Sequence, residues 1–236
     1  MEESAWACYR VEISMLRNDN SGADVFADFL VREVNCHRVN ERLYLIDIVA
    51  EEDAENSMLL SVMGRELYPI EVYVSEQGEI VNVRNWRESL SRVKRSLKSY
   101  KEQGGERLYG YLFNSIKEID SEEEYIAMLM RNTFFQLMFY NYVGGDRVHL
   151  VYDYPNYGDN VPFVYEKSPS VVNESGELYK AKLGRISAYN RYSYEGVARI
   201  KFQFSEGGLP NSVKASFLFD SDESGFYKKE VKIYKI

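Results

Sequence analysis

The sequence predicts an α+β fold, in which an antiparallel β-sheet made of N- and C-terminal strands packs around a central helical insert. Both ends of the 236-residue chain alternate polar and apolar residues with the period of two that is typical of half-buried strands. The middle of the chain has the longer period of helices. Strands, then helices, then strands indicate α+β rather than alternating α/β units. Since no repeat or linker interrupts the chain, we expect a single domain over residues 1–236.

Composition narrows the classes of function. Hydrophobic residues make up 45% of the chain, which is enough to bury a sizeable core. The formal net charge of −8 disfavours nonspecific binding of nucleic acid and favours a partner with basic patches. The first residues show no basic start followed by an apolar run. We therefore expect a cytoplasmic protein, or a periplasmic one if a leader has been removed.

The first half of the chain predicts three strands, at residues 6–17, 24–36 and 41–50. The apolar run from Leu43 to Val49 is nearly continuous, which predicts a central strand covered on both faces. Residues 54–63 have the composition of one or two helical turns. The two cysteines, Cys8 and Cys36, allow either a single bridge between neighbouring strands or two free thiols, and we favour free thiols.

A β-hairpin is predicted at residues 66–86. Ile70, Val72 and Val74 alternate with polar residues, a turn containing Gly78 follows, and the pattern returns through residues 80–83. Roughly residues 58–90 resemble uncharacterised bacterial proteins in which such a hairpin, with a glycine-bearing turn and a following Asn, precedes helices set against a curved antiparallel sheet. The named architecture that this stretch resembles is the lipoprotein-carrier-like one. The resemblance implies a curved sheet that cradles helices, with room for a hydrophobic cavity.

Asn85 is placed to cap a helix from Trp86 to about Gln103. Its apolar seam is narrow, and its other faces are basic in an otherwise acidic protein. The basic residues could dock on an acidic partner, but a solvated face is the favoured interpretation. In the helix from Trp86, the basic residues are Arg87, Arg92, Lys94, Arg95, Lys98 and Lys101, and the seam residues are Trp86, Leu90, Val93, Leu97 and Tyr100.

A further helix is predicted over residues 106–119.

The most hydrophobic stretch predicts one continuous buried helix over about residues 121–143. Ser121 and Glu124 have the spacing of a capping box, and two glycines follow the stretch. The stretch is apolar over most of its circumference, which is typical of a buried helix. Polar residues near its middle, including Arg131, disfavour a membrane span. Met128, Phe135 and Met138 could line a cavity for a hydrophobic ligand, although a packed core is the favoured alternative.

After Gly145 the period returns to two. Strands are predicted to begin near Val148 and to cover residues 161–166, 177–188 and 192–204. Two more follow, one alternating around Val213 to Phe219 and one at residues 227–236.

The motifs of common enzymes and metal sites are absent from the sequence. Neither His37 nor His149 lies in a zinc-binding spacing, and there is no phosphate-binding or dinucleotide-binding glycine pattern. Asp220 to Gly225 copies the start of a calcium loop, but Val231 replaces the glutamate required at its twelfth position, so a hairpin turn is favoured. We expect no catalytic residues, no cofactor and no metal.

The leading hypothesis is a non-catalytic binding protein that engages a protein partner through an acidic, Tyr-rich surface, capping or neutralising a basic partner. The tyrosines of this surface lie in the stretch from Tyr152 to Tyr165, part of which has the composition of a loop. Exposed tyrosine gives rigid contact area at low entropic cost. The alternative is a carrier that holds a lipid or other hydrophobic ligand between sheet and helices. An enzyme without a known motif is a third reading. The predicted partner-binding residues are Tyr152, Asp153, Tyr154, Tyr157, Asp159 and Tyr165.

Overall fold

The structure is a computed structural model of the chain. It describes residues 6–18, 24–53, 65–76, 78–102, 116–139, 148–152, 160–165, 171–173, 176–183, 194–204, 209–221 and 225–236.

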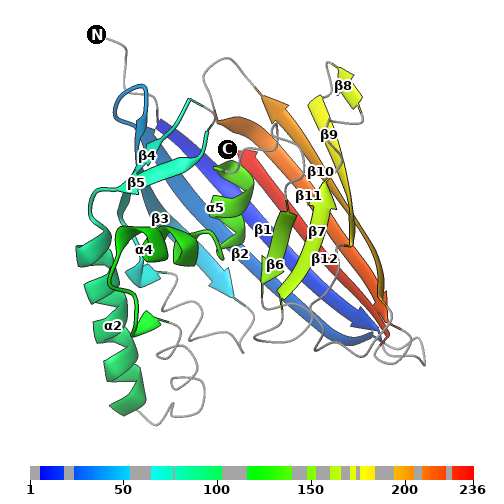
Figure 1. Cartoon of the computed structure of the whole chain (residues 1–236), viewed down its shortest axis with the longest axis horizontal. Helices are drawn as coiled ribbons and strands as arrows, with labels where there is room; N and C mark the ends of the chain where they lie inside the picture. The colour runs from blue at the N-terminus through cyan, green and yellow to red at the C-terminus, as the bar shows by residue number, and fades with distance from the viewer. Residues whose placement is uncertain are drawn as a thin grey trace.

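The fold is α+β, built on one large antiparallel sheet (Figure 1). Eleven strands follow the order β5-β4-β3-β2-β1-β12-β11-β10-β9-β7-β6, and β8 pairs with β9. Strand β1 pairs with β12, so the two ends of the chain meet in the middle of the sheet. The strands are β1 Trp6–Asn18, β2 Asp24–Arg38, β3 Leu43–Asp53, β4 Ile70–Val74, β5 Ile80–Val83, β6 Val148–Tyr152, β7 Asn160–Tyr165, β8 Val171–Asn173, β9 Gly176–Leu183, β10 Tyr194–Phe204, β11 Pro210–Ser221 and β12 Gly225–Lys235.

Most predicted strands are confirmed. Buried and less buried side chains alternate along strands such as β4, as the apolar and polar residues do in the sequence. Gly78 adopts a φ of +86° in the β4–β5 turn, a conformation that glycine accepts without strain. Ser221 pairs with Gly225, which confirms that the Asp220 stretch closes a hairpin. Strand β3 corrects one prediction: Val49 is 56% exposed, so this strand is not covered on both faces along its length. The short strand β8 was not predicted.

In the described part of the chain, the helices are α2 Trp86–Glu102, α4 Glu122–Leu129 and α5 Thr133–Met138. The prediction of one continuous helix over 121–143 is wrong. Helix α4 ends at Met130, and Asn132 starts α5 because its side chain accepts a hydrogen bond from the Phe134 amide. The predicted capping box is confirmed, since Ser121 and Glu124 exchange both hydrogen bonds.

Helix α2 begins where predicted, but Asn85 acts differently. Its carbonyl accepts the first helical hydrogen bond from the Ser89 amide. Its side chain does not cap the helix but forms hydrogen bonds with the backbone at the start of β4. The side-chain oxygen accepts from the Glu71 amide and the side-chain nitrogen donates to the Pro69 carbonyl. The seam is buried at Leu90, Val93 and Leu97, as predicted. For the predicted helix at 106–119, residues before 116 lie outside the described part of the chain, as do residues 54–63.

The sheet is curved around its helix-bearing face, which we call the inner face. The rings of Phe163 on β7 and Phe217 on β11 lie 5.5 Å apart, although β9 and β10 separate these strands in the order. Strands about 4.8 Å apart would hold them about 14 Å apart in a flat sheet. Helix α5 lies over this face (Figure 1), where Thr133 accepts a hydrogen bond from the buried Lys229 of β12 at 3.1 Å.

Among the described helices, not one combines the length and the apolar character that crossing a bilayer would require.

Candidate functional site

The predicted partner-binding residues fall at the β6–β7 hairpin. Tyr152 is the last residue of β6 and pairs with Asn160, and Tyr165 ends β7 opposite Ala181 of β9. The structure thus brings the two ends of the Tyr-rich stretch together as one hairpin. Asp153, Tyr154, Tyr157 and Asp159 lie outside the described residues.

The predicted hydrophobic-ligand residues lie on two helices of the inner layer. Met128 of α4 is half-buried, whereas Phe135 and Met138 of α5 are buried. The Phe135 ring packs on Tyr68 at 6.1 Å and on Phe139 at 6.0 Å. Phe135 has an exposed fraction of 0%. A void large enough for water would leave accessible area on the side chains around it, so protein atoms fill the space around this ring.

The basic helix α2 uses two of its cations to bind backbone carbonyls. Arg92 donates to the carbonyls of Glu66, Leu67 and Pro69 at 3.1 Å each, and Lys94 reaches the carbonyls of Lys117 and Ile119. These cations hold neighbouring segments in place. Arg95 and Lys98 are exposed and form the solvated part of the helix.

A buried hydroxyl chain links α4 to α2. The Tyr125 hydroxyl donates to Ser89 Oγ at 2.6 Å, and Ser89 donates to the Leu67 carbonyl. Both side chains are 0% exposed. Burial raises the pKa of Tyr125 to about 12, with the Ser89 hydrogen bond and Arg92 acting in the opposite direction. Tyr125 is therefore neutral at physiological pH and acts as a structural donor.

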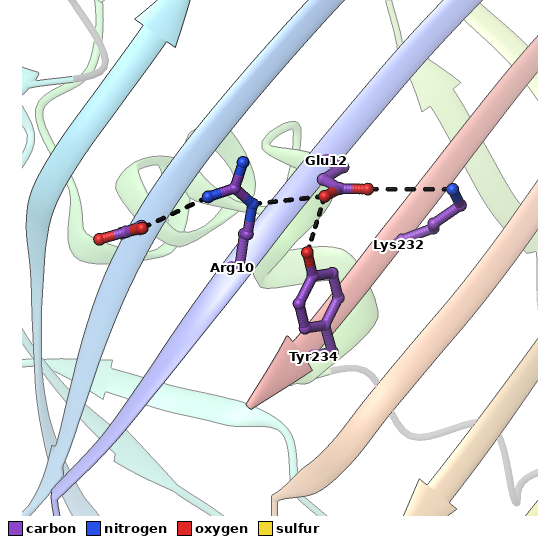
Figure 2. A network of polar contacts seen from close by, with 5 residues as sticks. Arg10, Glu12, Lys232 and Tyr234 are labelled. Carbon is purple, nitrogen blue, oxygen red and sulfur yellow. Dashed lines mark hydrogen bonds and ion pairs between the residues drawn. The ribbon is translucent and has the colours of Figure 1, made fainter. Parts of the chain in front are cut away.

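A connected polar array lies on the opposite face of the sheet, which we call the outer face. Figure 2 shows Arg10 and Glu12 on β1 and Lys232 and Tyr234 on β12. Arg10 lies 3.3 Å from Glu12 and 3.5 Å from Glu33 of β2. Tyr234 donates to Glu12 at 2.7 Å, and Lys232 lies 3.9 Å from the second Glu12 oxygen. We call these five residues the outer-face array.

Register explains why these residues meet. Arg10 lies directly opposite Glu33 on one side and Tyr234 on the other, and Glu12 lies opposite Lys232. Residues directly opposite in an antiparallel pair share a face and come within side-chain reach. Arg10 and Glu12 are two residues apart in the predicted strand 6–17, so its alternation puts them on one face. Nothing in the sequence identifies their partners more than two hundred residues away.

The array fixes the charge of Glu12. The hydrogen bond from Tyr234 and, after it, Arg10 and Lys232 lower the pKa of the Glu12 carboxyl, against partial desolvation. The same hydrogen bond raises the pKa of the Tyr234 hydroxyl. Glu12 therefore stays ionised and Tyr234 protonated near neutral pH, so the array presents a fixed pattern of charges and one hydroxyl.

An open depression of about 500 Å³ lies on the β4–β5 hairpin, where Arg42 pairs with Glu76, both largely exposed. These two charges satisfy each other across the depression. Its lining residues are Arg42, Tyr73, Val74, Ser75, Glu76, Val81 and Asn82.

The cysteines are free thiols on opposite faces of the sheet. Cys36 pairs with Ala7, and Cys8, the next residue, therefore points the other way. Burial raises the pKa of the Cys36 thiol, which keeps it protonated. In the described ranges, no three His, Cys, Asp or Glu side chains gather as a metal site would require.

No family model and no curated protein matches the chain. Among solved structures, the chain is similar to lipovitellin, in a structure concerned with lipid–protein interactions, with a TM-score of 0.46 and 7% identity. The similarity covers 98% of this chain and 25% of that one, so this chain spans about a quarter of its length.

Proposed function

We propose that the chain is a non-catalytic binding protein that engages a protein partner through the outer face of its sheet. The observation that carries this proposal is the outer-face array, in which Glu12 is held by Arg10, Tyr234 and Lys232 at once. Side chains fixed before binding lose less conformational entropy in a complex. Fixed charges of both signs also orient a protein partner and reject wrongly charged ones.

The inner face supports the same proposal over the alternative of a carrier. A ligand between sheet and helices would have to replace the ring contacts of Phe135 with Tyr68 and Phe139, since that ring is already covered by protein. Apolar cores resist such replacement because their packing is already close to crystal density.

The Tyr-rich hairpin is a second contact region in this proposal. Strands β6 and β7 hold Tyr152 and Asn160 opposite each other, and a loop held on a sheet is a frequent site of recognition. The acidic residues predicted from the sequence, Asp153 and Asp159, belong to this region by sequence, and the outer-face array supplies charges of both signs.

Native mass spectrometry of the chain purified from its own host tests the proposal. The wild-type chain should carry a stoichiometric protein partner. A triple variant, Arg10→Gln, Glu12→Gln and Tyr234→Phe, removes two charges and the hydroxyl of the array, and it should lose that partner. The exposed pair Arg95→Gln and Lys98→Gln is the control and should retain it. A chain that instead carries a stoichiometric lipid and no protein contradicts the proposal in favour of the carrier.

A further inference from the structure

A row of cations crosses the outer face next to the array. Lys201 of β10 lies directly opposite Lys214 of β11, which lies directly opposite Lys232 of β12. Arg199 lies on the same face of β10, two residues before Lys201. Arg199, Lys214 and Lys232 are exposed, and Lys201 is half-buried. We call these four residues the cationic ladder. It is a local basic surface on a chain with a net charge of −8.

The ladder costs the isolated fold free energy. Like charges directly opposite on neighbouring strands destabilise a sheet. Lys232 has Glu12 at 3.9 Å, but over the described ranges no carboxylate lies within ion-pair distance of Arg199, Lys201 or Lys214. Elsewhere on this face of β12, Lys228 has a counter-charge two residues along the same strand, since it pairs with Glu230 at 2.8 Å. The charges of Arg199, Lys201 and Lys214 are therefore open to a counter-charge from a bound partner.

We infer that the cationic ladder binds an acidic, extended polypeptide segment of the protein partner. Strands lie about 4.8 Å apart, and same-face residues on one strand recur about every 6.8 Å, so the four charges sample both spacings. An extended segment with acidic residues at alternate positions repeats its carboxylates at about the same 6.8 Å interval. Such a segment can place carboxylates against several of the four cations at once.

The shape of the sheet favours a flexible segment over other anionic surfaces. The sheet curves toward the inner face, as the contact of Phe163 with Phe217 requires, so the outer face is convex. A flat membrane surface would touch only the crest of a convex face. Nonspecific nucleic-acid binding depends on a broad basic surface that displaces counterions, which a chain with a net charge of −8 lacks.

Fluorescence anisotropy with a labelled peptide of alternating glutamate and serine tests this inference. The full chain should bind the peptide with an affinity that falls steeply as salt rises. The double variant Lys201→Gln, Lys214→Gln should weaken binding at least about tenfold. The control Arg95→Gln, Lys98→Gln makes the same change in net charge on α2 and should change affinity less than about twofold.

A charge reversal separates binding from a structural role. Lys214→Glu should abolish peptide binding while raising the denaturant midpoint, because it places an anion between Lys201 and Lys232. A lowered midpoint, or equal loss of binding in ladder and control variants, overturns the inference. The inference is also overturned if the chain does not bind the peptide but binds phosphatidylserine vesicles or duplex DNA, and if that binding is lost in the ladder variants.

The inference rests on the proposed function, and the two can fail separately. If the peptide does not bind but the chain from its host carries a protein, the acidic-segment inference is wrong and the proposed function stands. If the chain from its host carries a lipid and no protein, the proposed function fails whatever the peptide does.

Discussion

Phe135 is the residue on which the inner layer depends most. It is fully buried and its ring contacts Tyr68, Phe134 and Phe139. Phe135→Ala should lower the free energy of unfolding by about 3–5 kcal/mol, since it removes apolar contact and leaves a cavity. Phe204→Ala is the matched control, because Phe204 is 52% exposed and stacks only on Phe202 among the described rings. Denaturant melts in which both variants lose the same stability would contradict this placement.

Tyr125 shows the contribution of a buried hydroxyl. Tyr125→Phe removes the donor to Ser89 in a site with no water access, so we expect a loss of about 1–3 kcal/mol. Tyr73→Phe, on the half-buried surface of the hairpin, should change stability by less than about 0.5 kcal/mol. Chemical denaturation of both variants measures the difference, and two equal values would show that the Ser89 contact is dispensable.

Glu12 makes the stability of the fold depend on pH. Its folded pKa lies below its ordinary value, so its contacts stabilise the fold above that ordinary value and lose this effect as pH falls through the folded pKa. The difference in stability between wild type and Glu12→Gln should therefore be largest near neutral pH and shrink between about pH 5 and pH 3. Urea melts across this range give the measurement. A difference that is constant with pH would show that Glu12 makes no net favourable contact in its ionised form.

At the scale of single residues, the sequence predicts which side chains share a strand face but not which side chains they contact on neighbouring strands. Alternation placed Arg10 and Glu12 together, and the structure adds Glu33, Tyr234 and Lys232 from other strands. Those contacts depend on register between distant segments, and register is fixed by how whole strands pack.

Among the elements, the break between α4 and α5 differs most from expectation. Apolar residues on all sides predicted one helix, but Asn132 ends one and starts the next. Its amide donates to the Leu129 carbonyl, and its side chain accepts from the Phe134 amide. Asparagine is a preferred first residue of a helix, so the signal was present in the sequence but was outweighed by the apolar run. Two short helices can follow a curved sheet more closely than one straight helix.

Asn132 therefore carries a prediction of its own. Asn132→Ala should cost about 1 kcal/mol of stability, because it leaves the first amides of α5 without their acceptor. Asn132→Asp keeps an oxygen at the same place and should retain most of the stability. If Asn132→Ala melts like the wild type, or if aspartate fails to rescue it, the side chain does not start α5.

The edge strand β5 shows how the helices protect the sheet. The Val83 amide, which points away from β4, donates to the Glu122 carboxylate in the first turn of α4. An uncovered strand edge invites pairing with other chains. The local sequence puts Glu122 in the first turn of a helix, where the dipole favours negative charge, but it does not identify the Val83 amide as its partner.

The whole molecule is one sheet with two different faces. Patterns of period two predicted its strands, and their placement before and after the helices predicted the α+β class. The strand order was not predictable, because β1 and β12 join residues from opposite ends of the chain. The outer-face array depends on that joint, so it could not be derived from local patterns. The cationic ladder instead lies on β10, β11 and β12, which are consecutive along the chain, and depends on the register of these three strands. The residues predicted for recognition at the Tyr-rich loop stay a prediction, since most lie outside the described part of the chain.

Site-specific photo-crosslinking tests most directly whether the outer face is the binding surface. A photoreactive amino acid replaces Ser216, which lies on the outer face between Glu230 and Arg199, or Val81, which is 58% exposed on β5 at the far end of the strand order. Irradiated in the native host, the Ser216 chain should form one discrete protein adduct, and the Val81 chain should not. Crosslinks from Val81 with none from Ser216 would contradict binding through the outer face.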